Sequence, residues 1–126
     1  MLLAGYLSEN GVKTYCTGGY IAEAPCILAG ELTNNAFANF HADVMFFSVG
    51  GMYKNMVYCG SEEFLKHHRI MLENSDKHVL LMASDKIDKT RKMILCGLDE
   101  LDYFITDGEF SDEMIKKHSS TNFVKV

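Results

Sequence analysis

The apolar run at residues 44–49, Val-Met-Phe-Phe-Ser-Val, constrains the fold of this chain more than any other feature. Apolar side chains on both faces of one strand are typical of a parallel sheet, whose two faces are both covered. The glycine pair Gly50-Gly51 ends the run, as a turn at the end of a strand does. We therefore predict that residues 44–49 form an inner strand of a mainly parallel sheet.

Helical and strand-like segments alternate along the rest of the chain, with no linker between them. Spacing and capping residues predict helices at residues 2–7, 28–40, 61–72 and 111–118. Apolar alternation or short apolar runs predict strands at residues 12–16, 78–82, 93–95, 103–106 and 123–126. This order is typical of right-handed crossovers, so residues 1–126 are predicted to form one α/β domain with helices on both faces of the sheet.

Composition excludes several classes of function for the isolated chain. Its 126 residues carry a net charge of -5, whereas nucleic-acid binders present a basic face to phosphates. The four cysteines are far apart, and we interpret them as buried free thiols rather than zinc ligands or disulfides. No apolar stretch reaches the length of a membrane helix, and the first residues do not resemble a signal peptide. We expect a cytoplasmic protein with no metal, no cofactor and no membrane association.

Three loops that follow predicted strands have the composition of an anion site. Gly18-Gly19 follows the first strand, Gly50-Gly51 follows the apolar run, and Lys86 lies in the Ser-Asp-Lys loop after residues 78–82. Glycine lets backbone amides approach an anion, and lysine supplies a point charge that suits phosphate. Ligands of α/β sheets bind beyond the carboxyl ends of the strands, so we predict a site between these loops. The alternative for each glycine pair taken alone is an ordinary turn.

Two further residues near the start of the third predicted helix are weaker ligand candidates, Glu63 and Lys66. Acidic residues in a first helical turn are also explained by the helix dipole alone. The basic stretch at residues 89–92 is interpreted as a solvated loop. The chain contains no nucleophile elbow, no phosphate-binding P-loop and no dinucleotide fingerprint, so we predict no catalytic residue.

Taken together, the order of these pieces resembles the C-terminal sensor domain of DeoR-family bacterial transcription regulators. The matching segments include Gly18-Gly19, Gly30 in a Leu-Ala-Gly-Glu-Leu context, and residues 42–51, 69–75, 79–86 and 98–107. The resemblance covers about nine tenths of the chain. At two positions the pattern differs: Ala83 stands where the family has aspartate, and Phe64 stands where it has a helix glutamate, with Glu63 as the neighbour.

The resemblance implies a fold similar to ribose 5-phosphate isomerase, glucosamine 6-phosphate deaminase and CoA transferases. It also implies a phosphorylated sugar as effector, bound without turnover. DNA would be bound only through a winged-helix domain, which we expect to be absent from this chain together with the first part of the sensor domain.

Alternatives to this hypothesis are a small phosphosugar isomerase or deaminase, with Glu63 as its acid or base, and an oligomerisation fragment without ligand. Missing opening strands would leave part of the sheet uncovered, and an open apolar edge favours pairing between chains. We therefore also predict a homo-oligomer.

Overall fold

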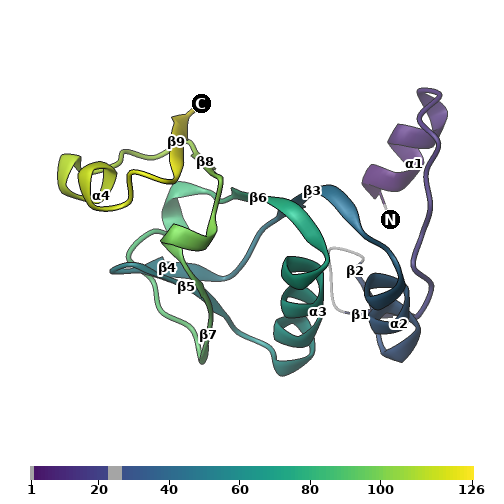
Figure 1. Ribbon diagram of the computed structural model, residues 1–126. Helices are drawn as coiled ribbons and strands as arrows, with labels where there is room; N and C mark the ends of the chain where they lie inside the picture. The colour runs from purple at the N-terminus through teal and green to yellow at the C-terminus, as the bar shows by residue number, and fades with distance from the viewer. Residues whose placement is uncertain (1, 23–26) are drawn as a thin grey trace.

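A four-stranded parallel sheet lies at the centre of the fold (Figure 1). The structure is a computed structural model that describes residues 2–22 and 27–126. The strand order is β3-β6-β8-β9, and each neighbouring pair is parallel. Its strands are β3 (Ala42–Phe47), β6 (Ser75–Leu81), β8 (Tyr103–Thr106) and β9 (Asn122–Lys125). The predicted α/β class with a mainly parallel sheet is confirmed.

A smaller antiparallel sheet of order β4-β5-β7 packs against one face of the parallel sheet. Its strands are β4 (Gly51–Tyr53), β5 (Met56–Cys59) and β7 (Met93–Gly97), while β1 (Tyr20–Ala22) and β2 (Ile27–Ala29) form a separate hairpin. The sequence patterns predicted the β7 strand but not the β4–β5 hairpin. Lys54, in the hairpin turn, has a positive φ of 47°, which lets two very short strands reverse direction.

The described residues form four α-helices: α1 (Leu2–Glu9) precedes the first strand, whereas α2 (Glu31–Asn39), α3 (Glu62–Glu73) and α4 (Asp112–Lys117) connect strands. Two 3₁₀ turns, η1 (Ser84–Lys86) and η2 (Leu98–Glu100), follow β6 and β7. The α4 start agrees with its sequence, because the Ser111 hydroxyl accepts a hydrogen bond of 3.1 Å from the Met114 amide. Helices α2 and α3 lie side by side. No helix among the described residues is long and apolar enough to cross a membrane.

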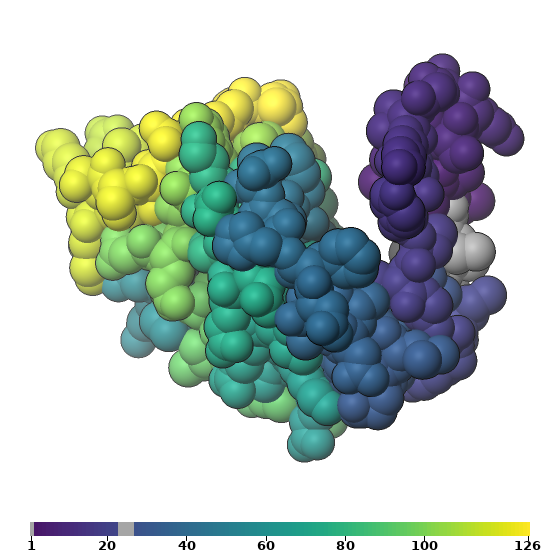
Figure 2. Space-filling view, turned by 45° about the vertical axis from the view of Figure 1, so that its right-hand side comes forward, coloured from purple at the N-terminus to yellow at the C-terminus, as the bar shows by residue number. Residues whose placement is uncertain are grey.

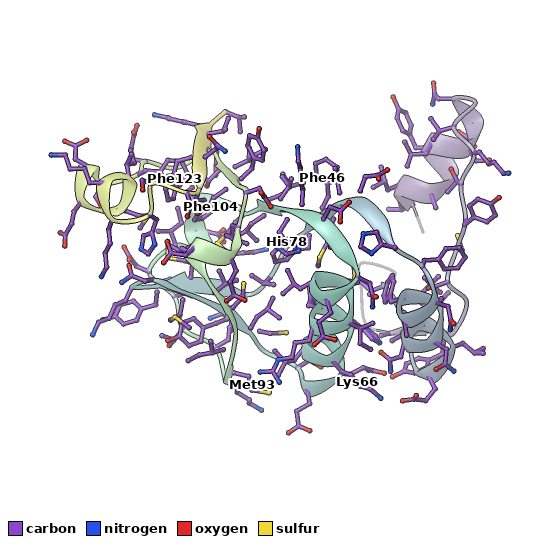
Figure 3. The ribbon with its side chains drawn as sticks, in the orientation of Figure 1. Phe46, Lys66, His78, Met93, Phe104 and Phe123 are labelled. Atoms are coloured by element: carbon purple, nitrogen blue, oxygen red, sulfur yellow. The ribbon has the colours of Figure 1, made fainter. Side chains whose placement is uncertain are left out.

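The hydrophobic core lies between the parallel sheet and the small antiparallel sheet. Phe104 is fully buried and packs against Phe110 and Phe123, with ring centroids 5.2 and 6.2 Å away (Figure 3 labels Phe104 and Phe123). The other buried members of the core come from both sheets, from α3 and from the loops between them: Met45, Phe47, Val49, Met52, Val57, Cys59, Leu65, Leu80, Met82, Leu95, Cys96, Leu98 and Leu101. Burial of one continuous cluster across two sheets explains how so short a chain forms a core.

The cysteines differ in their exposure. Cys59 and Cys96 are buried free thiols, as predicted, whereas Cys16 is exposed, contrary to the prediction. Cys26 lies outside the described residues. Burial raises the pKa of Cys96 to about 12, so its thiol stays protonated at neutral pH and is a poor nucleophile.

The predicted inner position of residues 44–49 is wrong, because β3 is the edge strand of the parallel sheet and pairs only with β6 among the described strands. Its side chains alternate: Met45 and Phe47 are 3% and 6% exposed, whereas Val44 and Phe46 are 39% and 63% exposed. An apolar run indicates that both faces of a strand need cover, but it carries no information on how many neighbours the strand has.

The face of the parallel sheet that carries Phe46, here called the outer face, is mainly apolar and partly exposed, although Val79 at its middle is buried. Register places Val79 and Leu81 of β6 and Tyr103 and Ile105 of β8 on this face with Phe46. Leu81 and Tyr103 are 42% and 39% exposed. The helix layer predicted for this face is not formed over these strands by residues 2–22 and 27–126.

Residues 2–17, here called the N-terminal arm, stand apart from the rest of the molecule (Figure 2). The strand predicted at residues 12–16 pairs with no described strand, and α1 buries none of its residues. Leu2, Leu3 and Tyr6 of α1 are 80%, 69% and 65% exposed. The arm therefore has the helix and the extended segment that the sequence predicts, but its apolar side chains contact little of its own chain.

Candidate functional site

The carboxyl ends of β3, β6 and β8 lie at one edge of the sheet because these strands are parallel. Gly50 and Gly51 follow β3, and Lys86 lies in η1 after β6. An isolated parallel bridge between Met52 and Ile87, together with a 3.0 Å hydrogen bond from the Lys89 amide to the Met52 carbonyl, joins the two loops. Three of the seven residues predicted for the site, Gly50, Gly51 and Lys86, therefore lie on adjacent loops.

Glycine is required in the β3 loop because the segment after Lys86 lies directly against it. A Cβ atom on Gly50 would be 3.0 Å from both Cγ and Nε of Arg91, and one on Gly51 would be 2.3 Å from the Lys89 carbonyl oxygen. The Arg91 side chain also passes 3.8 Å from the Cβ position of Gly60, just before α3. The close approach is a packing reason for both glycines, and it places the Arg91 side chain over Gly50.

Two cationic side chains thus lie at this edge. Lys86 is half-buried; its backbone amide donates to the Ala83 carbonyl at 3.1 Å, whereas its ammonium group forms no hydrogen bond or ion pair with any residue that the structure describes. Arg91 is exposed, and its Nη1 donates to the Thr90 carbonyl at 2.9 Å. The interpretation of residues 89–92 as a solvated loop missed the contact of Arg91 with Gly50. The sequence feature that could have indicated a role for Arg91 is the run of basic residues directly after a strand-end loop.

Asp107 fixes the loop that carries Lys86. Its Oδ1 accepts a 2.7 Å hydrogen bond from the Ser84 amide, so the loops after β6 and β8 are joined. This backbone hydrogen bond lowers the pKa of Asp107 below its ordinary value, and the carboxylate stays charged. Gly108 permits the contact, since a Cβ there would lie 2.9 Å from the Ser84 Cβ. Asp107 thus has a structural role at the site edge that the sequence patterns did not predict.

Gly18 and Gly19 belong to a second group of residues, around β2 and α2. Both have positive φ, 74° and 108°, and a Cβ on Gly19 would lie 2.2 Å from the Ala29 carbonyl oxygen. The Gly18 carbonyl accepts a 2.7 Å hydrogen bond from the Thr33 hydroxyl. The turn conformation and this packing explain the glycine pair without a ligand.

Glu63 and Lys66 are also engaged by partners in this second group. The Tyr20 hydroxyl lies 2.7 Å from both Glu63 carboxylate oxygens, and this hydrogen bond raises the pKa of Tyr20. Lys66 Nζ lies 2.8 Å from Glu31 Oε1, and the hydrogen bond with Lys66 lowers the pKa of Glu31. Within the described ranges, no hydrogen bond or ion pair connects this group with the Gly50–Lys86 group.

His67 of α3, whose ring packs against Phe37 of α2, is a buried polar residue that the sequence patterns did not indicate. It is 4% exposed, and its Nε2 atom has no hydrogen-bond partner among the described residues. Burial lowers the pKa of His67 below its ordinary value of 6.5; the Glu63 and Glu31 carboxylates oppose this shift, and His68 and Lys66 add to it. The folded chain therefore holds His67 neutral at pH values where the unfolded chain protonates it.

This difference predicts a loss of stability in mild acid. The unfolded chain takes up a proton at His67 below about pH 6.5, and the folded chain does so only at lower pH. The contribution of His67 to the free energy of unfolding is therefore complete above about pH 6.5 and declines as the pH falls below that value. Denaturant unfolding between about pH 7.5 and pH 5.5, compared with His67→Leu, measures the effect, since both proteins share every other titrating group. The variant should lose less stability than the wild type; equal losses would show that His67 does not contribute.

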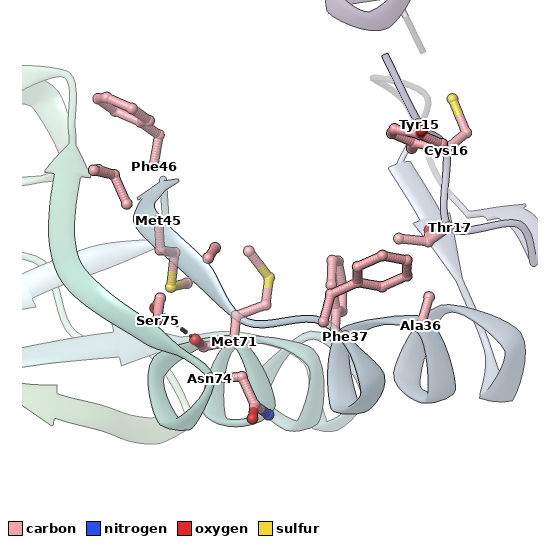
Figure 4. A pocket seen from close by; sticks show the side chains of 13 residues that line it. Tyr15, Cys16, Thr17, Ala36, Phe37, Met45, Phe46, Met71, Asn74 and Ser75 are labelled. Atoms are coloured by element: carbon pink, nitrogen blue, oxygen red, sulfur yellow. Dashed lines mark hydrogen bonds between the residues drawn. The ribbon is translucent and has the colours of Figure 1, made fainter. Parts of the chain in front are cut away.

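A cleft of about 380 Å³, here called the β3 cleft, is lined by none of the seven predicted site residues (Figure 4). One side is formed by Tyr15, Cys16 and Thr17 of the N-terminal arm, and the other by residues of β3. Side chains of α2 and α3, including Phe37 and Met71, form its floor. The lining is mainly apolar, so the β3 cleft suits a hydrophobic segment rather than an anion.

Comparison with known proteins identifies the family of the chain. The family model of the DeoR C-terminal sensor domain matches residues 1–108. The L-fucose operon activator of Haemophilus influenzae is 27% identical over 111 residues, which cover 87% of this chain and 45% of that protein. The lactose phosphotransferase system repressor of Streptococcus mutans is 27% identical over 112 residues, which cover 89% of this chain and 45% of that protein.

The chain spans less than half the length of these two curated relatives. The family match covers the parallel strands β3, β6 and β8 and the loops with Gly50, Gly51, Lys86 and Arg91. The strand order and the glycine and lysine loops that first suggested the resemblance are therefore part of the matched region. The chain belongs to the DeoR C-terminal sensor domain family.

Proposed function

We propose that this chain binds a phosphorylated sugar as an effector and does not turn it over, as the sensor part of a cytoplasmic regulator of sugar metabolism. The observation that carries the proposal is the convergence of Lys86, Arg91 and the Gly50-Gly51 loop at one carboxyl edge of the sheet. Two cations beside glycine amides suit a phosphate group. In this proposal, the regulator would contact DNA through a winged-helix part and not through the residues that bind the effector.

The two cations would contribute differently to phosphate binding. Lys86 is a point charge with no partner among the described residues, so it is available to a ligand without breaking an ion pair. Arg91 presents a planar guanidinium that can hold two phosphate oxygens at once. The other four predicted site residues lie around α2 and α3: Gly18, Gly19, Glu63 and Lys66. In this proposal they contribute to effector binding only if the ligand extends toward α3 and replaces the present partners of Glu63 and Lys66.

The names of the relatives support the sugar part of the ligand. One is an activator of an L-fucose operon and the other is a repressor of a lactose phosphotransferase system. Both names refer to a sugar, although one describes an activator and the other a repressor. We infer a sugar phosphate as the class of effector for this chain.

Turnover of the sugar would require a free acid or base at the ligand. Glu63 is the only carboxylate that the sequence patterns suggested for this role, and its two oxygens accept from the Tyr20 hydroxyl. At the Lys86 edge, the Asp107 carboxylate is engaged by the Ser84 amide. These contacts favour a binding role over an isomerase or deaminase.

Isothermal titration calorimetry of the whole chain tests the proposal. Aldose and ketose 6-phosphates form the ligand panel, and the parent sugars and inorganic phosphate serve as controls. We expect saturable binding of at least one sugar phosphate, weaker binding of its parent sugar, and full recovery of the unchanged ligand by NMR after incubation. Isomerised or deaminated product would contradict the binding role, and absence of binding across the panel would overturn the proposed ligand class.

A further inference from the structure

Asp107 places a fixed negative charge near one cation of the proposed phosphate site. Its Oδ1 accepts the 2.7 Å hydrogen bond from the Ser84 amide, and Ser84 begins the η1 turn that Lys86 ends. Because this hydrogen bond also lowers the pKa of Asp107, the carboxylate remains ionised at neutral pH. The charge therefore stays beside the turn that carries Lys86 for as long as this contact holds.

Glu63 places a second carboxylate near the other cation, Arg91. The Arg91 side chain passes 3.8 Å from the Cβ position of Gly60, and Glu63 follows three residues later in the first turn of α3. The Tyr20 hydroxyl holds this carboxylate through 2.7 Å contacts with both oxygens. The Tyr20 ring in turn lies on Gly30, where a Cβ atom would approach two ring carbons to 3.2 Å. Tyr20 is thus a positioning residue for the Glu63 carboxylate.

The other cations of this region are not fixed in the same way. Lys89 and Lys92 are exposed, and no described residue forms an ion pair with either of them. Water and salt therefore screen their charges. Lys66 is engaged by Glu31, with Nζ and Oε1 2.8 Å apart. A ligand held by the two cations of the site thus has fixed carboxylates near it and no further fixed cation.

We propose that this site accepts a sugar with one phosphate group and rejects a sugar with two. The inference rests on the proposed function and extends it by stating the charge of the effector. The phosphate contacts Lys86 and Arg91, and the sugar lies beside the Asp107 or the Glu63 carboxylate, whose oxygens can accept hydrogen bonds from hydroxyl groups. A second phosphate in that place would bring like charges together, which is unfavourable by itself and has no cation to offset it.

Glu63 acts in this inference through its charge and keeps its hydrogen bond with Tyr20. Repulsion between charges extends over about 10 Å at 0.1 M ionic strength, so the carboxylate excludes a second phosphate without contacting the ligand. Salt weakens this exclusion, whereas it does not weaken exclusion by steric overlap. The dependence on ionic strength therefore separates a selection by charge from a selection by size.

Isothermal titration calorimetry of the whole chain tests the inference. Each aldose and ketose 6-phosphate is compared with the 1,6-bisphosphate of the same sugar, and the measured quantity is the ratio of the two dissociation constants. Glu63→Gln and Asp107→Asn each remove one negative charge but keep an oxygen that can accept the present hydrogen bond. Tyr20→Phe keeps the ring on Gly30 and removes the hydroxyl that fixes the Glu63 carboxylate.

Glu73→Gln is the matched control. It removes the same charge from the opposite end of the 12-residue helix α3, about 15 Å along the helix axis from Glu63. Glu73 is exposed, so its substitution leaves the packing of α3 unchanged. Circular dichroism checks that each variant is folded, and Glu63→Gln decides the outcome alone if Asp107→Asn does not fold.

We expect the wild type to bind the bisphosphate roughly tenfold or more weakly than the monophosphate at about 0.05 M ionic strength, and the ratio to fall toward one at about 0.5 M. Glu63→Gln and Asp107→Asn should each lower the ratio by roughly threefold. Tyr20→Phe should lower it less, because the carboxylate keeps its charge but loses its fixed position. Glu73→Gln should have the wild-type ratio.

A wild type that binds the bisphosphate as tightly as the monophosphate would overturn the inference, because the exposed lysines at residues 89 and 92 would then serve the second phosphate. A ratio that persists at high salt and in both charge variants would assign the exclusion to size and would also overturn it. Either result leaves the proposed function standing. Failure of the wild type to bind any monophosphate or bisphosphate would instead overturn the proposed function, and the inference with it.

Discussion

Replacing Phe104 with alanine is expected to lower the free energy of unfolding by about 3–5 kcal/mol. Phe104 is fully buried in β8, and its ring contacts the rings of Phe110 and Phe123. Removal of the ring loses its burial and leaves a cavity among aromatic groups that surrounding β-strands cannot close. Phe123 belongs to β9 and Phe110 to the segment before α4, so the loss weakens the docking of the whole carboxyl-terminal part.

Guanidinium chloride unfolding, followed by circular dichroism at one protein concentration, measures this effect. Ile94→Ala in β7 is the matched control, since Ile94 is 44% exposed and leaves no comparable cavity. Its expected cost is below about 1 kcal/mol. If the two substitutions cost the same, the Phe104–Phe110–Phe123 cluster would not be the packed centre that the structure describes.

The sequence patterns predicted the α/β class and most parallel strands, because each helix or strand produces its own apolar periodicity within a short stretch of sequence. The order of these stretches along the chain then indicates the fold class. The sequence patterns missed the β4–β5 hairpin, whose strands are only three and four residues long. Short strands lack enough residues for a period of two to be recognised. The sequence patterns also placed residues 44–49 at an inner position of the sheet. Apolar side chains indicate that the faces of a strand are covered, but they do not indicate whether one or both of its edges pair with another strand.

The predicted proximity of the candidate residues holds where topology alone brings their loops together. Gly50, Gly51 and Lys86 follow neighbouring parallel strands, so their loops meet whatever the intervening sequence is. Gly18, Gly19, Glu63 and Lys66 instead pack around β2 and α2, in contacts with Thr33, Tyr20 and Glu31 that depend on tertiary structure. Arg91 was missed for the same reason, since only the folded chain shows it lying over Gly50.

Substitution of Lys86 by alanine is expected to weaken binding of the sugar phosphate by about 1.5–3 kcal/mol, the range for a hydrogen bond to a charged group. This corresponds to a rise of roughly 10- to 150-fold in the dissociation constant. The free energy of unfolding should change by less than about 0.5 kcal/mol, because the Lys86 ammonium has no partner among the described residues and alanine keeps the backbone hydrogen bond to Ala83. A loss of affinity without a loss of stability identifies a ligand contact rather than a structural role.

Arg91 provides an independent check of the same site. Arg91→Lys keeps the charge but removes the planar fork, so it should weaken binding of a phosphate held by two oxygens, and Arg91→Ala should weaken it further. Lys116→Ala is the control, since Lys116 lies in the last turn of α4, away from the loops that carry Lys86 and Arg91. Titration calorimetry with the tightest sugar phosphate of the panel measures all four variants. Wild-type affinity in both Lys86→Ala and Arg91→Ala would move the phosphate site away from this edge, because the proposed site rests on these two cations beside Gly50 and Gly51.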